Sequence, residues 1–451
     1  MRSFFSTCII LIITFSSENA QAQKNTLSVD GHPAWIEQGN IYEVNVRQYT
    51  PEGTFRAFSK HLSRLKEMGV QTLWFMPVNP ISKKDRKGAL GSYYAVSDYT
   101  AINPEFGNMA DWKELVRKAH QMGFKVIIDW VPNHSGADNV WLTTHPDFYV
   151  KDKNGNALSP FDWTDVRKFD YENRLLRDSM IAAMKFWIRT TDIDGFRCDV
   201  AGDVPKDFWS DCIGQLRKMK NIFMLAESNA AWLHDAGFDA TYTWDAFNMM
   251  KMIAHGDRPA FGLDSVLHQV NDTYTKNALR MYFTSNHDEN SWNKADFGTM
   301  PGHSQTPFAV LTQTIERSVP LIYSGQEEPV LDSISFFFKD TIPFSNFERA
   351  NFYKVLLSLR KNNPALAANA AFKKVRTSND AAIYAFEREK NGRKVLVILN
   401  LTNATQRFSW NGHPSTSSWT NVFANQKESI YEQYKFLPWE YRVLETRQAG
   451  H

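Results

Sequence analysis

The sequence predicts an α/β fold: a (β/α)8 TIM barrel with a short domain inserted after the third strand and an antiparallel β-domain at the C-terminus. Eight short apolar segments alternate with amphipathic helical segments, as in repeated β-α units, and the pattern changes to short alternating segments after Pro364. A doubly wound open sheet is the alternative, but it favours a glycine-rich phosphate-binding turn after its first strand, and the chain has none there. Eight strand–helix units within residues 34–366 fit the barrel.

The N-terminal residues predict export. A basic residue at the start is followed by an apolar run through Phe15 and by Ala-Gln-Ala ending at Ala22. This pattern is typical of a secretory signal peptide, which we place at residues 1–22 with cleavage after Ala22. The apolar run is too short to span a bilayer, and no later segment reaches that length. We therefore expect a periplasmic or extracellular protein without a membrane span.

Eight segments rich in β-branched and aromatic residues are the expected barrel strands. The segments between them repeat their apolar residues at helical spacing, and two of them, 55–69 and 109–123, end on glycine, which favours a helix C-terminus. The expected strands begin at Ile41, Thr72, Lys125, Gly195, Ile222, Ala240, Arg280 and Pro320.

Two long irregular segments follow the second and third strands. The first covers residues 79–107, and the second, rich in Asn, Asp, Gly and Pro, is the predicted inserted domain at residues 135–173. Loops at this end of the strands are where barrels build their sites. After the barrel, residues 370–448 contain short alternating segments separated by polar turns, which predict a C-terminal β-sandwich domain.

Composition excludes one class of partner. The formal net charge is +2, and 22% of residues are charged, so nothing indicates binding to nucleic acid. Cys8 lies within the predicted signal, which leaves Cys198 and Cys212 in the mature chain. Export permits a disulfide, but the first cysteine lies on a predicted strand and the second on the following helix. We therefore favour two buried thiols.

Polar side chains occur where four of the predicted strands end. The C-terminal ends of barrel strands meet at one mouth, so we expect these side chains to converge. A single strand-end aspartate is usually a helix cap or a loop hydrogen-bonder, but that explanation is weaker for four ends together. The four ends carry Asp129, Asn133 and His134; Arg197 and Asp199; Glu227; and His287 and Asp288.

The ends of two consecutive predicted strands carry Asp199 and Glu227, and their surroundings predict that one carboxyl is ionised and the other protonated. Arg197 and Asp199 are two residues apart, so they project to the same side of a strand, where the guanidinium favours an ionised carboxylate. Glu227 follows three apolar residues, a setting that is expected to raise its pKa and keep it protonated. An ionised nucleophile beside a protonated acid is the arrangement of a retaining glycosidase, with Asp288 as a third acidic group.

The motifs DWVPNH, GFRCD, the glutamate of LAES, and SNHDEN occur in an order and spacing that resemble the α-amylase family of glycoside hydrolases (glycoside hydrolase family 13). GSYYAVSDYTAINPEFG and PLIYSGQE resemble two further motifs of that family, so the resemblance covers about residues 41–364. It implies a catalytic barrel and retaining hydrolysis or transfer at α-glucosidic bonds. The expected substrates are starch-like glucans or maltooligosaccharides, with α-1,4 bonds favoured.

The resemblance also implies roles for single residues. Asp199 matches the catalytic nucleophile, Glu227 the general acid/base and Asp288 the transition-state stabiliser. Asp129 and Asn133 match framework positions at the start of the inserted domain. The positions that hold the nucleophile or the sugar match Tyr94, His134, Arg197 and His287.

The chain departs from the family pattern in two places. Many members have a Lys-His pair three and four positions after the nucleophile, but Gly202 and Asp203 stand here, so a preference for long starch chains does not follow. The best counterpart of an acidic calcium ligand is Lys168, and an ammonium group cannot ligate a hard cation. We predict that no cofactor is required and that the usual calcium site, which includes Asn133, is absent; calcium elsewhere is left open.

The compact insertion predicts a fairly open cleft. Trp141, Trp163 and Tyr149 offer stacking faces for glucosyl units, although each could equally belong to the core. The first hypothesis for function is an exported α-glucan hydrolase. An α-glucosidase or α-glucan transglycosylase is the alternative, because the covalent intermediate can pass to water or to another sugar. A non-catalytic glucan-binding protein is disfavoured, because the three carboxylates are retained.

Overall fold

The computed structural model describes residues 30–293, 300–329, 332–412, 414 and 418–446. The predicted signal peptide, residues 1–22, lies outside the described residues. No helix within the described part of the chain is long and apolar enough to cross a membrane.

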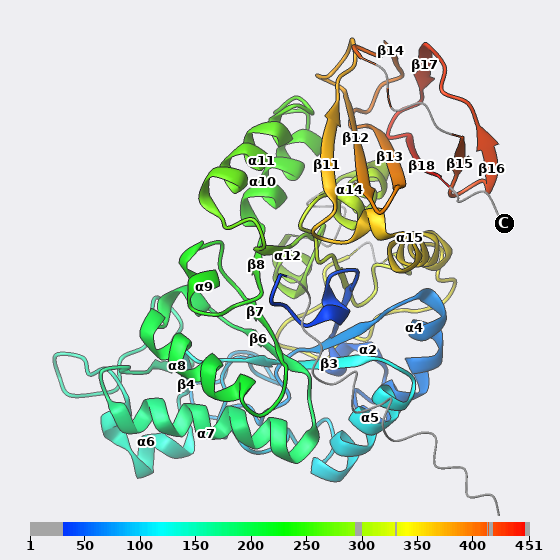
Figure 1. Ribbon diagram of the computed structural model, residues 1–451. Coiled ribbons are helices and arrows are strands. Elements are labelled where there is room, and N and C mark those ends of the chain that lie inside the picture. Colours follow the sequence, from blue (N-terminus) through cyan, green and yellow to red (C-terminus); the bar gives the residue numbers. More distant parts are fainter. Residues whose placement is uncertain (1–29, 294–299, 330–331, 413, 415–417, 447–451) are drawn as a thin grey trace, which may run out of the picture.

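Eight parallel strands form the central sheet in the order β10-β1-β2-β3-β6-β7-β8-β9, which confirms the predicted strands (Figure 1). The two end strands are joined by backbone hydrogen bonds of 2.9 Å from the amides of Val319 and Leu321 to the carbonyls of Arg280 and Tyr282. These bonds close the sheet into a barrel. The strands are β1 (Ile41–Val44), β2 (Thr72–Phe75), β3 (Lys125–Trp130), β6 (Gly195–Cys198), β7 (Phe223–Ala226), β8 (Ala240–Tyr242), β9 (Leu279–Met281) and β10 (Leu321–Tyr323).

Helices surround the barrel strands, and their ends follow local sequence signals. The helix after β1 ends at Gly69, which adopts the left-handed conformation (φ 100°) that glycine allows. Asn108 and Asp111 form a capping box at the start of α5. The helices are α2 (Val46–Tyr49), α3 (Phe55–Phe58), α4 (Leu62–Met68), α5 (Met109–Gln121), α7 (Arg174–Thr191), α8 (Lys206–Arg217), α9 (Trp232–Asp235), α10 (Trp244–Ala254), α11 (Gly262–Thr273), α12 (His287–Asn293), α14 (Gln305–Thr314) and α15 (Ala350–Asn362).

The segment between β3 and α7 contains a short antiparallel ribbon. β4 (His134–Gly136) pairs with β5 (Val166–Lys168), and α6 (Val140–Thr144) lies between them in the chain. Trp141 stacks on Tyr99 with ring centroids 4.9 Å apart, and Tyr149 is buried, so both belong to the core. Of the three aromatic residues considered from the sequence, Trp163 is the one that lines a cavity.

The C-terminal residues form two antiparallel sheets. A six-stranded sheet has the order β11-β12-β13-β18-β15-β16, and a second sheet contains β14 and β17; Phe408 and Phe436 from the second sheet pack in one apolar cluster with Ile398 from the first. The strands are β11 (Ala371–Val375), β12 (Ile383–Lys390), β13 (Arg393–Asn400), β14 (Gln406–Ser409), β15 (Trp419–Asn421), β16 (Gln426–Glu428), β17 (Gln433–Phe436) and β18 (Tyr441–Thr446).

Arg388 on β12 joins the C-terminal sheet to the barrel. Its side chain is fully buried, and its Nη1 donates 2.7 Å hydrogen bonds to the carbonyls of Thr314 and Ile315 at the C-terminal end of α14. Its Nη2 donates to the carbonyls of Ala367 and Ala370. The guanidinium therefore hydrogen-bonds to carbonyl groups at the C-terminal end of α14 and in the segment just before β11.

The two cysteines of the mature chain are buried and unpaired. Cys198 lies on β6, and Cys212 lies on α8. The Sγ of Cys212 lies 3.5 Å from the Sδ of Met184. The prediction of two buried thiols is therefore confirmed.

Candidate active site

A cavity of about 620 Å³ opens at the C-terminal ends of the barrel strands. One predicted site residue, Arg197, does not line this cavity. It is fully buried and hydrogen-bonds to the lining residue Asp199. The structure thus brings together all seven side chains for which the resemblance implies a catalytic or sugar-binding role. The six that line the cavity are Tyr94, His134, Asp199, Glu227, His287 and Asp288.

Arg197 contacts carboxylates from three neighbouring strands. Its Nη1 donates 2.9 Å hydrogen bonds to Asp129 and to Asp199, and its Nη2 lies 2.7 Å from an oxygen of Glu227. The hydroxyl of Tyr242 accepts from its Nε at 3.1 Å. One guanidinium therefore fixes the relative positions of Asp199 and Glu227.

Burial and the neighbouring Glu227 oppose the effect that Arg197 is expected to have on the charge of Asp199. Burial, followed by the neighbouring Glu227 carboxylate, raises the pKa of Asp199 well above its ordinary value, although Arg197 acts in the opposite direction. Glu227 is not in a purely apolar setting, because it pairs with Arg197 and hydrogen-bonds to Asp199. The close approach of the two carboxyls makes ionisation of Asp199 less favourable.

The backbone after Asp199 is bent to meet Glu227. Val200 adopts a left-handed conformation with φ 44° and ψ 40°, which is strained for a β-branched residue. Its amide donates a 2.9 Å hydrogen bond to Oε2 of Glu227. The strained residue thus supplies a donor that orients the second carboxylate.

His287 joins Asp288 to a buried carboxylate on β1. Its Nδ1 lies 2.5 Å from Oε1 of Glu43, and its Nε2 lies 2.7 Å from the hydroxyl of Tyr94 and 3.3 Å from Oδ2 of Asp288. Burial lowers the pKa of His287, but the carboxylates of Asp288 and Glu43 outweigh it, so the pKa is raised well above its ordinary value. The resulting imidazolium lowers the pKa of Asp288 against the effect of burial. Asp288 is therefore held ionised.

Tyr94 and His134 border the cavity in different ways. The hydroxyl of Tyr94 also donates a 3.0 Å hydrogen bond to Asp129, and its ring stacks on His287. His134 packs edge-on to Trp163, with ring centroids 5.5 Å apart. Burial lowers the pKa of His134 to about 3, so its imidazole is neutral at neutral pH.

Three residues in or next to the cavity were missed from the sequence. Glu43 is fully buried, and a charged residue within the apolar segment IYEVNV is the signal that could have found it. Phe336 stacks on Tyr94, and Trp292 hydrogen-bonds to Asp288, but no local pattern marks these two residues. They come from segments whose positions depend on the whole fold.

Asn133 and Lys168 stand at the position of the family's usual calcium site. The amide Nδ2 of Asn133 faces Nδ1 of His134 at 3.3 Å, and Lys168 pairs with His134 across the β4–β5 ribbon. Among the described residues, no group of three or more His, Cys, Asp or Glu side chains is arranged to hold a metal. Calcium requires several oxygen ligands, and an ammonium supplies none.

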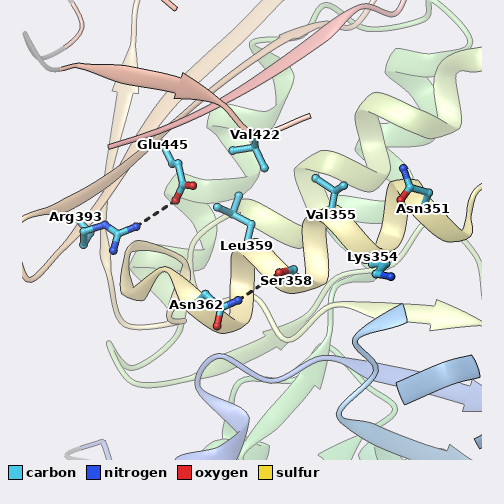
Figure 2. Close-up of a pocket in the computed structure, with 9 residues that line it drawn as sticks. All are labelled: Asn351, Lys354, Val355, Ser358, Leu359, Asn362, Arg393, Val422 and Glu445. Carbon is cyan, nitrogen blue, oxygen red and sulfur yellow. Dashed lines mark hydrogen bonds and ion pairs between the residues drawn. The ribbon is translucent and has the colours of Figure 1, made fainter. Parts of the chain in front are cut away.

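A second cavity of about 680 Å³ lies far from these carboxylates, between α15 and the C-terminal sheet (Figure 2). Its polar groups are partly paired with one another: Arg393 contacts Glu445 at 3.2 Å, and Asn362 donates to Ser358 at 3.3 Å. It holds one carboxylate, Glu445, and therefore lacks the paired acids found at the barrel mouth.

Comparisons with known proteins agree with this geometry. Residues 15–167 and 151–390 match the family model "Alpha amylase, catalytic domain". The chain is 25% identical to alpha-amylase MalA of Haloarcula japonica, over 82% of this chain and 56% of that protein, and 25% identical to alpha-amylase 2 of Dictyoglomus thermophilum, over 90% and 77%. A noncanonic maltogenic alpha-amylase from Thermotoga neapolitana superimposes with a TM-score of 0.83 at 28% identity, over 91% of this chain and 99% of that one. With an α-amylase barrel, a matching catalytic-domain model and paired carboxylates at the barrel mouth, the chain belongs to the α-amylase family of glycoside hydrolases.

Proposed function

We propose that the enzyme cleaves α-glucosidic bonds, with α-1,4 bonds favoured, in starch-like glucans or maltooligosaccharides, with retention of anomeric configuration. The observation that supports retention is the shared contact of Asp199 and Glu227 with Arg197 and with each other. An inverting enzyme separates its two carboxyls widely enough to hold a water molecule between base and sugar. The close approach of the two carboxyls instead suits a nucleophile that attacks the anomeric carbon opposite the leaving oxygen and an acid that protonates that oxygen.

In the first step, Asp199 attacks the anomeric carbon, and the bond from that carbon to the glycosidic oxygen breaks. Glu227 acts as the general acid and transfers a proton from its carboxyl group to the departing oxygen. In the second step, Glu227 removes a proton from water, the oxygen of that water forms a bond to the anomeric carbon, and the carboxylate of Asp199 is released. A sugar hydroxyl in place of water gives transglycosylation.

The remaining cavity residues bind the sugar at the reaction centre. Asp288, held ionised by His287, stabilises the positive charge that develops on the sugar ring. Tyr94 presents its ring to the sugar. The neutral imidazole of His134 and the imidazolium of His287 hydrogen-bond to sugar hydroxyls.

Substitution of two aspartates, the proposed nucleophile and an exposed control, tests this proposal. Asp199→Asn is expected to lower kcat on a maltooligosaccharide at least about 1000-fold, because a neutral amide cannot act as the nucleophile. The control, Asp211→Asn, alters an exposed aspartate on α8 and should leave kcat within about threefold. NMR of the first-formed product should show the α-anomer. Near-normal activity of the Asp199 variant would refute the assignment, and a sugar-elongated product would favour transfer over hydrolysis.

We further propose that the protein is exported and requires no calcium. The signal-like residues 1–22 support export, and the poor fit of Asn133 and Lys168 to a hard cation supports the second point. N-terminal sequencing of the exported protein should begin at Gln23. After dialysis against a chelator, elemental analysis should find no calcium, and an assay should find full activity. Tightly bound calcium at Asn133 would contradict this.

A further inference from the structure

One side of the candidate active site is formed by three chain segments that are far apart in the sequence. Residues 82–91 follow β2, residues 162–167 belong to the segment after β3, and residues 334–340 follow β10. Each segment contributes side chains to the cavity lining, among them Lys87, Asp165 and Phe337. We name these three segments together the wall.

Ion pairs and hydrogen bonds connect the first two segments of the wall. The Nζ of Lys87 lies 3.4 Å from Oδ1 of Asp165, and both side chains line the cavity. Arg167 pairs with Asp85 at 2.6 Å. Asp138, just outside the wall, accepts the backbone amides of residues 83 and 84 at 2.8 and 3.0 Å. The loop after β2 is therefore tied to the segment after β3 at several points.

The first and third segments of the wall are also in direct contact. The amide of Leu90 donates a 3.0 Å hydrogen bond to the carbonyl of Phe337. Arg47, a buried residue on α2, donates to the carbonyls of Gly91 and Phe336 at 3.0 and 3.2 Å and thereby joins both segments. A Cβ placed on Gly88 would lie 2.6 Å from Cβ of Phe337, so only glycine allows this approach. The wall is continuous from Asp165 to Phe337.

The wall stands opposite the proposed acid Glu227. Two of its three segments follow β2 and β10, the strands on either side of β1, whereas Glu227 follows β7. In the strand order, β7 lies four strands from β1 in either direction, which is the far side of the barrel. The leaving sugar extends past the acid that protonates it. The sugar chain on the other side of the cleaved bond therefore points at the wall.

We propose that the wall closes the cavity at the non-reducing end of the substrate, so that the enzyme removes short units from the ends of α-glucan chains. This inference rests on the proposed function and specifies its substrate. Lys87 supplies an ammonium donor and Asp165 a carboxylate acceptor at the closed end, which suits the hydroxyls of a terminal sugar. A cavity volume of about 620 Å³ suits a short oligosaccharide at this end of the site.

Two maltoheptaoses test the proposal, one unmodified and one carrying a 4,6-ethylidene block on its non-reducing end. The unmodified chain should be cleaved, and the blocked chain should be cleaved at least about 50-fold more slowly, because the block clashes with the wall. Chromatography of the products should show short units appearing first from the unmodified chain. Equal cleavage of both chains would overturn the wall proposal. Cleavage of neither chain would contradict the proposed function itself.

Paired variants test the two residues at the closed end. The double variant Lys87→Ala/Asp165→Ala should lower kcat/KM for unmodified maltotriose about tenfold, by loss of charge-assisted hydrogen bonds to the terminal sugar. It should also raise the rate on the blocked chain relative to the unmodified one. The control, Glu114→Ala/Arg117→Ala, removes an exposed ion pair on α5 and should change neither rate. Identical behaviour of the two double variants would exclude Lys87 and Asp165 as specificity determinants.

Discussion

Arg197 sets the electrostatics of the candidate site, because its guanidinium contacts carboxylates that follow three adjacent strands. The spacing of Arg197 and Asp199 along one strand is visible in the sequence, and the contact between them was predicted from it. The contact of Arg197 with Glu227 was not predicted, because it crosses from β6 to β7 and depends on strand register. This second contact holds Glu227 beside Asp199, where the Glu227 carboxylate raises the pKa of Asp199.

Glu43 is a positioning residue whose removal should change the pH dependence of activity. Its Oε1 holds Nδ1 of His287, and its Oε2 has no hydrogen-bond partner among the described residues. Glu43→Gln keeps the shape but removes a charge that raises the pKa of His287. The imidazolium should then lose its proton at lower pH, so the alkaline limb of kcat/KM should move to lower pH.

The control for this prediction is Glu327→Gln. Glu327 is equally buried but accepts hydrogen bonds from Tyr42 and Arg64, away from the cavity. This variant should lose stability without any shift of the alkaline limb. An unshifted limb in the Glu43 variant, with activity lowered equally at every pH, would indicate a structural role for Glu43.

At the scale of elements, the turn from α7 into β6 depends on Asp194. Its Oδ2 accepts the amide of Val126 at 2.9 Å and contacts His120 at 2.7 Å, and Lys125 and Lys220 lie 3.3 and 3.1 Å from its Oδ1. Burial alone would raise the pKa of Asp194, but these partners lower it well below its ordinary value. The ionised carboxylate therefore holds the entrance of β6 against β3.

Asp194→Asn should lower the free energy of unfolding by about 3 kcal/mol at pH 7, because it leaves buried partners unpaired. A depressed pKa in the folded state contributes stability that is complete above about pH 4 and is lost as pH falls through the folded-state value. The difference between wild type and variant in urea melts should therefore be smaller at pH 3 than at pH 7.

Asp192→Asn provides the matched comparison two residues earlier. Asp192 adopts φ 56°, a left-handed conformation that asparagine tolerates, and about half of its side chain is exposed. This change should cost less than about 0.5 kcal/mol. Equal losses for the two variants, or a pH-independent loss at Asp194, would contradict the assignment of the turn to the Asp194 carboxylate.

At the scale of the whole molecule, the barrel and the C-terminal sheet are joined by buried polar and apolar contacts. Burial lowers the pKa of Arg388 to about 10, so it remains charged at neutral pH while its donors pair carbonyls of the barrel. Tyr384 on β12 also hydrogen-bonds to Asp264 on α11 at 3.0 Å. These contacts indicate that the two parts unfold together.

Arg388→Met should lower the free energy of unfolding by about 3 kcal/mol or more, because several buried carbonyls lose their donor. Calorimetry should show a lower Tm, with a transition that is broadened or split where the two parts separate. Arg407→Met changes an exposed arginine on β14 and should leave the transition unchanged. A wild-type transition in the Arg388 variant would show that this side chain does not couple the two parts.

The features predicted correctly from the sequence are those that depend on short local patterns of residues. The eight barrel strands follow from short apolar segments, and the polar residues at their ends follow from the rule that parallel strands share one mouth. The wall could not be predicted, because Lys87 meets Asp165 and Leu90 meets Phe337 only after the barrel has closed. The raised pKa of Asp199 has the same origin, since burial and the Glu227 carboxylate at the end of the neighbouring strand cause it.

The central claim is that Asp199 forms a covalent bond to the sugar, and trapping that intermediate tests it most directly. A 5-fluoro-α-glucosyl fluoride slows the second step more than the first, so the glycosyl-enzyme should accumulate. Mass spectrometry of peptides from the treated protein should place one glycosyl group on Asp199, and excess maltose should release it. A glycosyl group on another residue, or steady turnover to the β-anomer without any adduct, would contradict the account.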